Sequence, residues 1–407
     1  MPLLGRDVVL ADAVRTPFGR AKSDGLYAHT RADDMAVAVV RELLRRHPSV
    51  IPDRIGDVAI AATTQDGDQG LTLGRTVGML AGLPRAVPGY AIDRMCAGAM
   101  TAVTNVAAQI AVGAVDVALA GGVEHMGRHQ LGAAADVNPR FVAERLVAAD
   151  ALVMGATAEN LHDRYPQLTR DRADRYAEAS QHKYAQALAA GKITGDLVPV
   201  AVSDPERGWG LATADEPPRP GTTVAGMSTL PTPFRPGGRV TAATSSPLTD
   251  GATAALLMDA DTAQSLQLSP RLKLVSYAYA GVEPEVMGVG PVPATHRALE
   301  LAGLTMDDIG AIEINEAFAV QVLAFLDAFE LADDDPRVNP YGGAIAVGHP
   351  LAASGIRLMS QLATQFAHDP GIRFGITTMC VGLGQGGTVI WENPHHEASR
   401  STRRDRR

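Results

Sequence analysis

The sequence predicts an α/β fold made of two similar halves, each a βαβαβ-type unit with a mainly parallel sheet covered by helices. Apolar runs typical of buried strands alternate along the chain with amphipathic segments typical of helices. The pattern of residues 55–61 also returns at residues 309–315, 254 positions later. Alternation of this kind favours parallel strands with helices on their faces, and the repeat indicates that the chain builds the unit twice.

In the first half, an amphipathic helix from Asp33 to His47 precedes the strand at residues 55–61. A further helix and strand lead to a turn rich in small residues, which contains Cys96. Apolar residues then recur at helical spacing, so a helix is expected to begin near Cys96; they are Met100, Val103, Ala107 and Ile110. An apolar strand at residues 115–122 closes this half.

The second half repeats this order. A helix from Pro293 to Gly303 precedes the strand at residues 309–315, and a small-residue turn at residues 342–350 contains His349. Pro350 suits the first position of a helix, whose apolar stripe continues through Ile356, Met359 and Leu362. An apolar strand and a glycine-rich turn at residues 374–387 close the half.

Cys96 and His349 occupy matching places in the two halves, 253 positions apart. A pseudo-twofold arrangement would bring these two helix starts together. The unpaired backbone N–H groups and the dipole of a helix N-terminus favour a thiolate. We therefore expect Cys96 to be an activated thiol close to the imidazole of His349.

The region between the halves has a different texture. Residues 170–191 form a charged, alanine-containing helical segment, and residues 204–238 are rich in Pro, Gly and Thr. A long irregular segment of this kind is usually functional. The predicted domains are an N-terminal half (1–123, completed by 244–270), an inserted loop domain (124–243), a C-terminal half (271–395) and a disordered basic tail (396–407).

Composition excludes several classes of protein. The chain has 407 residues, 46% of them apolar and 20% charged, and a formal net charge of −9, which argues against non-specific nucleic-acid binding. No apolar run reaches the roughly 20 residues of a membrane span, and the N-terminus lacks the features of a signal peptide. Two cysteines suit a reducing compartment, so a cytoplasmic location is expected. No histidine cluster has metal-ligand spacing and no phosphate-binding loop occurs, so we expect no metal.

The two cysteines, Cys96 and Cys380, both lie in turns rich in small residues. Most free cysteines are buried and act as small apolar side chains, and composition alone favours that interpretation here. Four motifs reverse it: Arg94-Met95-Cys96-Ala97-Gly98, Asn315-Glu316-Ala317-Phe318-Ala319, Gly348-His349-Pro350 and Met379-Cys380-Val381-Gly382-Leu383-Gly384.

Together these motifs resemble those of the thiolase family. The resemblance runs from about Val8 to Glu392, and it includes the run at residues 121–127, the run at residues 154–160 and Ser245-Ser246. It implies a thiolase fold with layered α-β-α-β-α architecture. The runs at residues 124–127, 244–246, 287–293 and 380–386 are most similar to the 3-ketoacyl-CoA thiolases of fatty-acid β-oxidation. Val153 stands where short-chain biosynthetic members carry a histidine.

The residue types suit cleavage of a β-ketoacyl thioester. A thiolate at Cys96 would attack the keto carbon to give an acyl-enzyme, with His349 as its base. Cys380 would protonate the released enolate and later take the proton from CoA. The resemblance assigns one oxyanion hole to His349 with a water held by Asn315. It assigns the other to the backbone N–H groups of Cys96 and Gly382.

Coenzyme A is expected as a substrate, with no permanently bound cofactor. The resemblance places its pantetheine arm past Ser246 and Phe318 and its nucleotide end near Arg219. Where relatives often carry an arginine in a Leu-Arg-Pro-x-Phe run, this chain has Leu230-Pro231-Thr232-Pro233-Phe234, and this departure puts details of nucleotide binding in doubt. A second departure, at residues 352–355 after His349, is expected to alter packing alone. Glu316 is expected to anchor its loop through hydrogen bonds.

The resemblance also implies a homodimer or homotetramer and allows a complex with a multifunctional β-oxidation subunit. Three other functions stay open at this point. A biosynthetic thiolase that condenses two acetyl-CoA molecules would use the same residues. A β-ketoacyl synthase would pair its cysteine with two histidines, and a non-catalytic acyl-CoA-binding scaffold would keep the fold without turnover.

Overall fold

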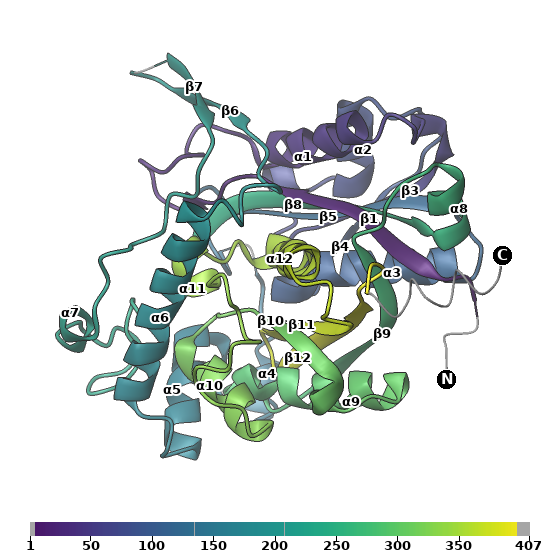
Figure 1. Cartoon of the computed structure of the whole chain (residues 1–407). Helices are drawn as coiled ribbons and strands as arrows, with labels where there is room; N and C mark the ends of the chain where they lie inside the picture. Colours follow the sequence, from purple (N-terminus) through teal and green to yellow (C-terminus); the bar gives the residue numbers. More distant parts are fainter. Residues whose placement is uncertain (1–4, 134, 207, 397–407) are drawn as a thin grey trace.

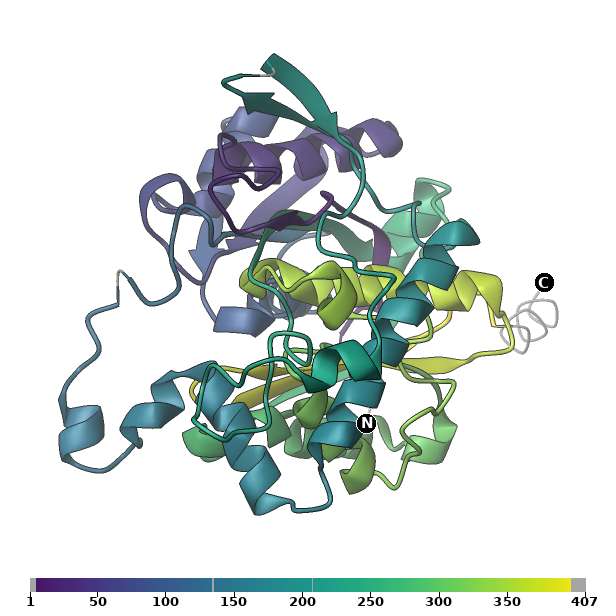
Figure 2. The same cartoon turned by 90° about the vertical axis from the view of Figure 1, so that its left-hand side faces the viewer.

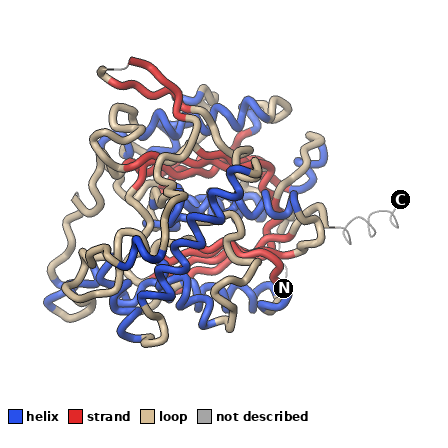
Figure 3. Tube along the Cα trace, turned by 60° about the vertical axis from the view of Figure 1, so that its left-hand side comes forward, coloured by secondary structure: helices blue, strands red, loops and turns tan. Residues whose placement is uncertain are grey.

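The computed structural model of the chain describes residues 5–133, 135–206 and 208–396. Two layers of strands lie one above the other, with helices between them and on both outer faces (Figures 1 and 3). This is the predicted layered α-β-α-β-α arrangement. The residues of the predicted tail from 397 onward lie outside the described part of the chain.

The N-terminal half forms the upper layer of Figure 1, in the strand order β1-β8-β5-β3-β4, with the short β2 paired to β8. Its helices α1 and α2 cover the outer face, and α3 lies on the inner face. Acidic residues in the first turn of α1 and basic residues in its last turn complement the helix dipole. The elements in chain order are β1 (Val8–Arg15), β2 (Gly19–Arg20), α1 (Ala32–Arg46), β3 (Ile55–Ala61), α2 (Leu73–Ala81), β4 (Tyr90–Ile92), α3 (Gly98–Ala111) and β5 (Val117–His125), with β8 (Thr249–Asp259) and α8 (Ala260–Ser265) contributed from later in the chain.

The C-terminal half forms the lower layer, in the order β10-β11-β12-β9. Helices α9 and α10 cover its outer face, and α12 lies on its inner face. The counterpart of β4 is reduced here to an isolated bridge between Ile312 and Val338. The elements are β9 (Leu272–Gly281), α9 (Pro291–Ala302), β10 (Ile309–Ile314), α10 (Ala319–Ala328), α11 (Ala344–Val347), α12 (Ser354–His368), β11 (Phe374–Val381) and β12 (Gln385–Glu392).

The expectation of mainly parallel sheets was wrong. Only β3–β4, β3–β5 and β10–β11 are parallel among the pairings of the large sheet in the described residues. The other strands return beside their neighbours in antiparallel pairs, such as the hairpin of β11 and β12. Antiparallel neighbours such as β11 and β12 need only a short turn, but partners such as β5 and β8 lie far apart in the chain, and the local pattern does not show that they pair.

The two central helices, α3 and α12, explain why the catalytic candidates are buried. Nearly every residue of α12 is buried, including the polar ones near its start. A helix enclosed on all sides lies within a core, and here the enclosure comes from one sheet above and one below (Figure 3). The layers are joined where β1 pairs with β9 at Val9 and Leu10.

The inserted region crosses one side of both layers (Figure 2). Its long helix α6 runs diagonally past the sheets, and the two-stranded hairpin of β6 and β7 projects from the body. The irregular segment predicted at residues 204–238 therefore contains a strand and a short helix. The elements of this region are α4 (Arg140–Ala143), α5 (Met154–Arg164), α6 (Arg170–Ala189), β6 (Val200–Asp204), β7 (Gly208–Ala212) and α7 (Val224–Ser228).

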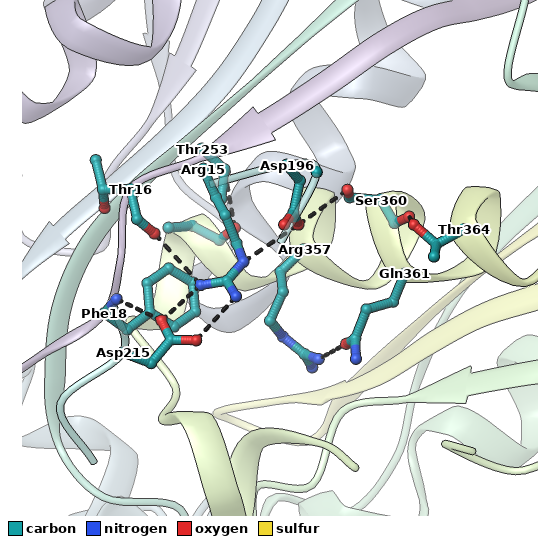
Figure 4. Close-up of polar contacts among 12 residues, drawn as sticks. Arg15, Thr16, Phe18, Asp196, Asp215, Thr253, Arg357, Ser360, Gln361 and Thr364 are labelled. Carbon is teal, nitrogen blue, oxygen red and sulfur yellow. Dashed lines mark hydrogen bonds and ion pairs between the residues drawn. The ribbon is translucent and has the colours of Figure 1, made fainter. Parts of the chain in front are cut away.

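A buried ionic network fastens the inserted region to both halves (Figure 4). Arg15, the last residue of β1, forms two parallel hydrogen bonds of 2.7 and 2.9 Å to Asp215 and a third of 3.2 Å to Asp196. Ser360 of α12 donates to the same Asp196 carboxylate at 3.0 Å, and Tyr184 of α6 donates to Asp215 at 2.7 Å. Burial alone would raise the pKa of Asp215, but Arg15 holds it below the ordinary value.

No helix among the described residues is long and apolar enough to cross a membrane. Within the same ranges, no group of three His, Cys, Asp or Glu side chains is placed to hold a metal ion.

Candidate active site

Cys96 lies in a short 3₁₀ turn, residues Met95–Ala97, directly before α3. Met95 adopts a left-handed conformation with φ 43°, and the Asp93 carboxylate accepts a 2.6 Å hydrogen bond from its backbone N–H. A left-handed backbone is costly for a residue with a side chain. The sharp turn aims the start of α3, and with it Cys96, at the space between the two layers.

His349 lies in the matching turn of the second half, between α11 and a 3₁₀ turn at Leu351–Ala353 that leads into α12. Gly348 has a φ of 102°, a conformation that residues with a Cβ rarely adopt, and a Cβ there would lie 2.3 Å from Thr249. The imidazole is 4% exposed. Its Nδ1 lies 2.6 Å from the hydroxyl of Ser354, the first residue of α12.

The two helix starts meet, as the repeat predicted. A Cβ on Gly98 would lie 3.0 Å from the Cβ of Ala352, and a Cβ on Gly355 would lie 2.5 Å from the backbone nitrogen of Met100. Only glycine allows backbones to approach this closely. The small residues after Cys96 and after His349 are therefore explained by the contact between the two halves.

Cys380 lies near the end of β11, opposite Gly386 of β12. Burial raises the pKa of its thiol far above the ordinary value, and the neighbouring Cys96 raises it further because a second negative charge would be repelled. The backbone N–H of Gly382, in the turn after β11, donates a hydrogen bond to the Cys96 thiol. These interactions place Cys96, Cys380 and Gly382 in one buried cluster.

Asn315 follows β10, and its backbone N–H donates to Thr378 of β11 at 2.9 Å. Its side-chain nitrogen lies 3.4 Å from Nδ1 and 3.3 Å from Nε2 of His349. Near-equal distances to both ring nitrogens place the amide beside the ring rather than on the axis of either lone pair. The in-plane lone pair of Nε2 is thus left for another partner.

Glu316 anchors the loop beside the site, as expected. Its carboxylate accepts hydrogen bonds of 3.0 Å from Tyr176, 2.7 Å from Ser180 and 3.0 Å from Asn339. It also accepts a 3.0 Å bond from the backbone of Ile345 in α11, four residues before His349. With its lone pairs engaged in this way, Glu316 is poorly placed to act as a base.

The protonation state of Cys96 differs from the expectation. Burial raises its pKa to about 12, although the Gly382 N–H bond lowers it and the Glu124 carboxylate raises it. The resting group is therefore a thiol. Burial also lowers the pKa of His349 to about 3, with a contribution from the positive charge of Arg357, so the imidazole is a neutral base. A helix terminus acts over about one turn and is worth about 1 kcal/mol, which is less than the penalty of enclosing a thiolate between two sheets.

The CoA-binding candidates are placed in two groups. Ser246 and Phe318 are neighbours: Ser246 donates from its backbone and hydroxyl to the carbonyl of Ala317 at 3.0 and 3.2 Å. The Phe318 ring packs edge-to-face on Phe234, 6.3 Å between centroids. Arg219 is exposed in the inserted region, where Gln181 of α6 accepts from its backbone N–H at 2.8 Å. The structure thus brings Ser246 next to the segment that contains Asn315 and Phe318. Separately, it holds the backbone of Arg219 on α6.

Two polar residues of α12 escaped sequence reasoning. Ser354 belongs to the departure that was expected to alter packing alone, and this expectation was wrong because its hydroxyl contacts His349 directly. Arg357 is 1% exposed and donates to the side-chain amide oxygen of Asn315 at 3.4 Å. Helical spacing from His349 was the only available signal for either residue.

Fold and site together define an enzyme of the acyltransferase class, because a buried cysteine and a neutral imidazole on two turns that meet can carry an acyl group shielded from water. Comparison with family models then specifies the family. The thiolase N-terminal domain matches residues 8–261, and the thiolase C-terminal domain matches residues 268–393. The chain belongs to the thiolase family, which sets aside a β-ketoacyl synthase.

Similar proteins span nearly the whole chain. A 3-ketoacyl-CoA thiolase of Saccharophagus degradans is 43% identical over 394 residues, 96% of this chain and 100% of that protein. One from Idiomarina loihiensis is 40% identical, covering 95% of this chain and 99% of that protein. Among solved structures, an acetyl-CoA acetyltransferase of Bacillus anthracis superposes with a TM-score of 0.86 at 33% identity, covering 96% of this chain and 99% of that one. Human mitochondrial 3-ketoacyl-CoA thiolase gives 0.85 at 32% identity, covering 96% and 100%.

Proposed function

We propose that this chain catalyses the CoA-dependent cleavage of 3-ketoacyl-CoA to acetyl-CoA and a shortened acyl-CoA. Two observations support the proposal: the buried thiols of Cys96 and Cys380 interact with each other, and the turn after Cys96 packs against the turn after His349, whose ring lies beside Asn315. The names of the relatives at about 40% identity support the substrate class. The reaction proceeds in two half-reactions through an acyl group on Cys96.

In the first half-reaction, the Cys96 thiol gives its proton to His349 as its sulfur bonds to the keto carbon. The bond between the α and β carbons then breaks, and its electron pair moves to the α carbon and the thioester oxygen of acetyl-CoA. Cys380 donates a proton to that carbon and becomes a thiolate. A raised thiol pKa keeps Cys380 protonated until this step.

In the second half-reaction, the Cys380 thiolate takes the proton of an incoming CoA thiol. The CoA sulfur attacks the acyl carbon on Cys96, and the tetrahedral intermediate expels the Cys96 sulfur. His349 returns its proton to that sulfur, which restores the neutral thiol. Each residue ends in its starting protonation state, and burial favours that state for both thiols and for the imidazole.

Both half-reactions develop negative charge on a carbonyl oxygen. We assign one oxyanion hole to the backbone N–H groups of Cys96 and Gly382. We assign the other to His349 and a water held by Asn315, whose amide nitrogen lies beside the imidazole. Preorganised donors of this kind contribute about 3 kcal/mol each to catalysis.

We assign CoA binding to Ser246 and Phe318 for the pantetheine arm and to Arg219 for the nucleotide end. We also propose the division at residues 123/124, 243/244 and 270/271, with residues 124–243 as a CoA-binding loop domain. CoA is a substrate, with no metal required. A homodimer or homotetramer in the bacterial cytoplasm, with or without a multifunctional β-oxidation subunit, completes the proposal.

The neutral imidazole of His349 leads to a testable pH dependence. Its pKa of about 3 lies below pH 5, so the base stays unprotonated through the range from pH 5 to 7.5. Single-turnover acylation of Cys96 by a 3-ketoacyl-CoA is expected to change by less than about twofold over this range. An imidazole with an ordinary pKa near 6.5 would instead slow acylation about thirtyfold at pH 5. Rapid quench and intact-protein mass spectrometry measure the rate.

Substrate chain length separates degradative from biosynthetic thiolase. The biosynthetic function is favoured by the fold match to an acetyl-CoA acetyltransferase. Against it, Val153, which precedes α5 and is 50% exposed, stands where short-chain biosynthetic thiolases carry a histidine. We expect CoA-dependent cleavage of C8 and C16 3-ketoacyl-CoAs at rates comparable with C4. Strict preference for C4 would make the biosynthetic function correct, and no cleavage at any length would leave the acyl-CoA-binding scaffold.

A further inference from the structure

Arg357 is an unusual residue for the interior of this protein. It lies on the first turn of α12, is 1% exposed, and its Nε has no hydrogen-bond partner among the described residues. Its Nη1 donates to Gln361 one turn further along the same helix (Figure 4). Burial lowers its pKa, and Glu313, Glu316 and Asp196 balance its charge from a distance while Arg15 opposes it. Such an arginine is costly to bury, which calls for a role.

The second donor of Arg357 is directed at the active site. Its Nη2 lies 3.4 Å from the Asn315 side-chain oxygen, a long hydrogen bond, while the Asn315 nitrogen faces the imidazole of His349. A guanidinium can only donate hydrogen bonds. The Asn315 oxygen must therefore face Arg357, and the opposite orientation would press an NH₂ group against a cation.

This contact determines which end of the amide faces the reacting atoms. With its oxygen held by Arg357, Asn315 presents two N–H donors toward His349 and the space beside it. The backbone N–H of Asn315 and the hydroxyl of Ser354 cannot supply these donors. The first bonds to Thr378, and the second bonds to Nδ1 of the imidazole.

We propose that Arg357 is a positioning residue for thiolysis, which acts by holding the Asn315 amide with its donors toward His349. The inference rests on the proposed function of Asn315 and His349. Arg357 itself touches neither thiol nor imidazole through any hydrogen bond of the described residues. Its positive charge has a second effect in the same direction, because it helps to keep the imidazole neutral.

A double-mutant cycle tests the proposal. Arg357→Met removes the guanidinium with little change in length, and Asn315→Ala removes the amide. In the wild-type background, Arg357→Met is expected to slow acylation of Cys96 about tenfold or more, a coupling typical of residues that act through one another. In the Asn315→Ala background, the same change is expected to cost less than about threefold. Equal losses in both backgrounds would overturn the proposal.

The pH profile of acylation gives a readout that a purely structural role would not move. Arg357→Met is expected to shift the acid limb, which lies below pH 5 in the wild type, to higher pH, because His349 loses a neighbouring positive charge while Glu313, Glu316 and Asp196 remain. Arg357→Lys keeps the charge but has no planar fork, so it should retain the wild-type limb with a reduced rate. A wild-type limb in Arg357→Met would contradict the effect of the Arg357 charge on His349, whereas the double-mutant cycle decides its effect on Asn315.

Arg337→Met is the matched control, because Arg337 is a structured arginine paired with Asp335. It is expected to leave the acylation rate unchanged. If Arg357→Met does not fold, as judged by circular dichroism, the same cycle with Arg357→Lys decides: a loss that vanishes in the Asn315→Ala background supports the proposal, and additive losses overturn it. Wild-type protein that cleaves no 3-ketoacyl-CoA would refute the proposed function, whereas an active wild type with additive losses refutes the role of Arg357 alone.

Discussion

Cys96→Ser is expected to lower thiolysis by about 10⁴-fold or more, the scale on which removal of a catalytic nucleophile acts. A serine hydroxyl is close in size to the thiol, so the packing of the turn at residues 95–97 should survive. However, the neutral His349 must then deprotonate an alcohol, which is a far weaker acid than a thiol. Burial makes even the Cys96 thiol a weak acid, because it raises the pKa to about 12.

Two measurements isolate the step that is lost. Intact-protein mass spectrometry after mixing with a 3-ketoacyl-CoA, without free CoA, should show one acyl group on wild-type protein and none on Cys96→Ser. A thermal shift with CoA should be the same for both proteins, because the candidate CoA contacts lie elsewhere. Acylation of Cys96→Ser at the wild-type rate would mean that another residue is the nucleophile.

The sequence predicted the meeting of the two helix starts that follow Cys96 and His349 because both lie at equivalent points of a repeated unit. A repeat carries long-range information that local patterns lack: two equivalent helix starts meet when the halves are related by a pseudo-twofold axis. The glycines and alanines around both residues, such as Gly98 and Ala352, fit the same arrangement because they permit the close contact. The layered architecture was expected from the resemblance to the thiolase family.

The protonation state of Cys96 could not be predicted in this way. A helix N-terminus is visible in the sequence, whereas the enclosure of that terminus by a second sheet is a property of the tertiary structure. Arg357 was missed for a related reason. An arginine within an apolar helical stripe is normally assigned to an exposed face, but α12 has no exposed face because it lies between two sheets.

Contacts between distant segments were equally hidden. Arg15 and Asp215 are 200 residues apart, and neither belongs to a recognisable motif pair. The proximity of Cys380 to Cys96 was expected only through the proposed chemistry, since the hairpin of β11 and β12 that carries Cys380 offers no spacing that points to Cys96. The antiparallel pairs were missed because most of them join strands far apart in the chain, such as β5 and β8, and the alternation of strand and helix does not show which distant strands pair.

Cys380→Ser is expected to separate the two functions of the thiol pair. Acylation of Cys96 by a 3-ketoacyl-CoA in a single turnover should fall by less than about tenfold, because His349 and Cys96 remain. Proton transfer at the α carbon of acetyl-CoA should fall by at least about 100-fold, the usual contribution of a positioned acid or base. A serine hydroxyl in this position has a pKa too high to form the anion that the second half-reaction needs as a base.

Hydrogen–deuterium exchange at the acetyl-CoA methyl group reads this step directly. Acylated wild-type enzyme in D₂O should exchange the methyl hydrogens, since the Cys380 thiolate removes a proton and the thiol returns a deuteron. Acylated Cys380→Ser should show almost no exchange, while Cys380→Ala serves as the control for any residual activity of the hydroxyl. Equal losses of acylation and exchange in Cys380→Ser would show that the cysteine supports the geometry of Cys96 instead of moving a proton. Retained exchange in Cys380→Ser would show that a group other than Cys380 transfers the proton.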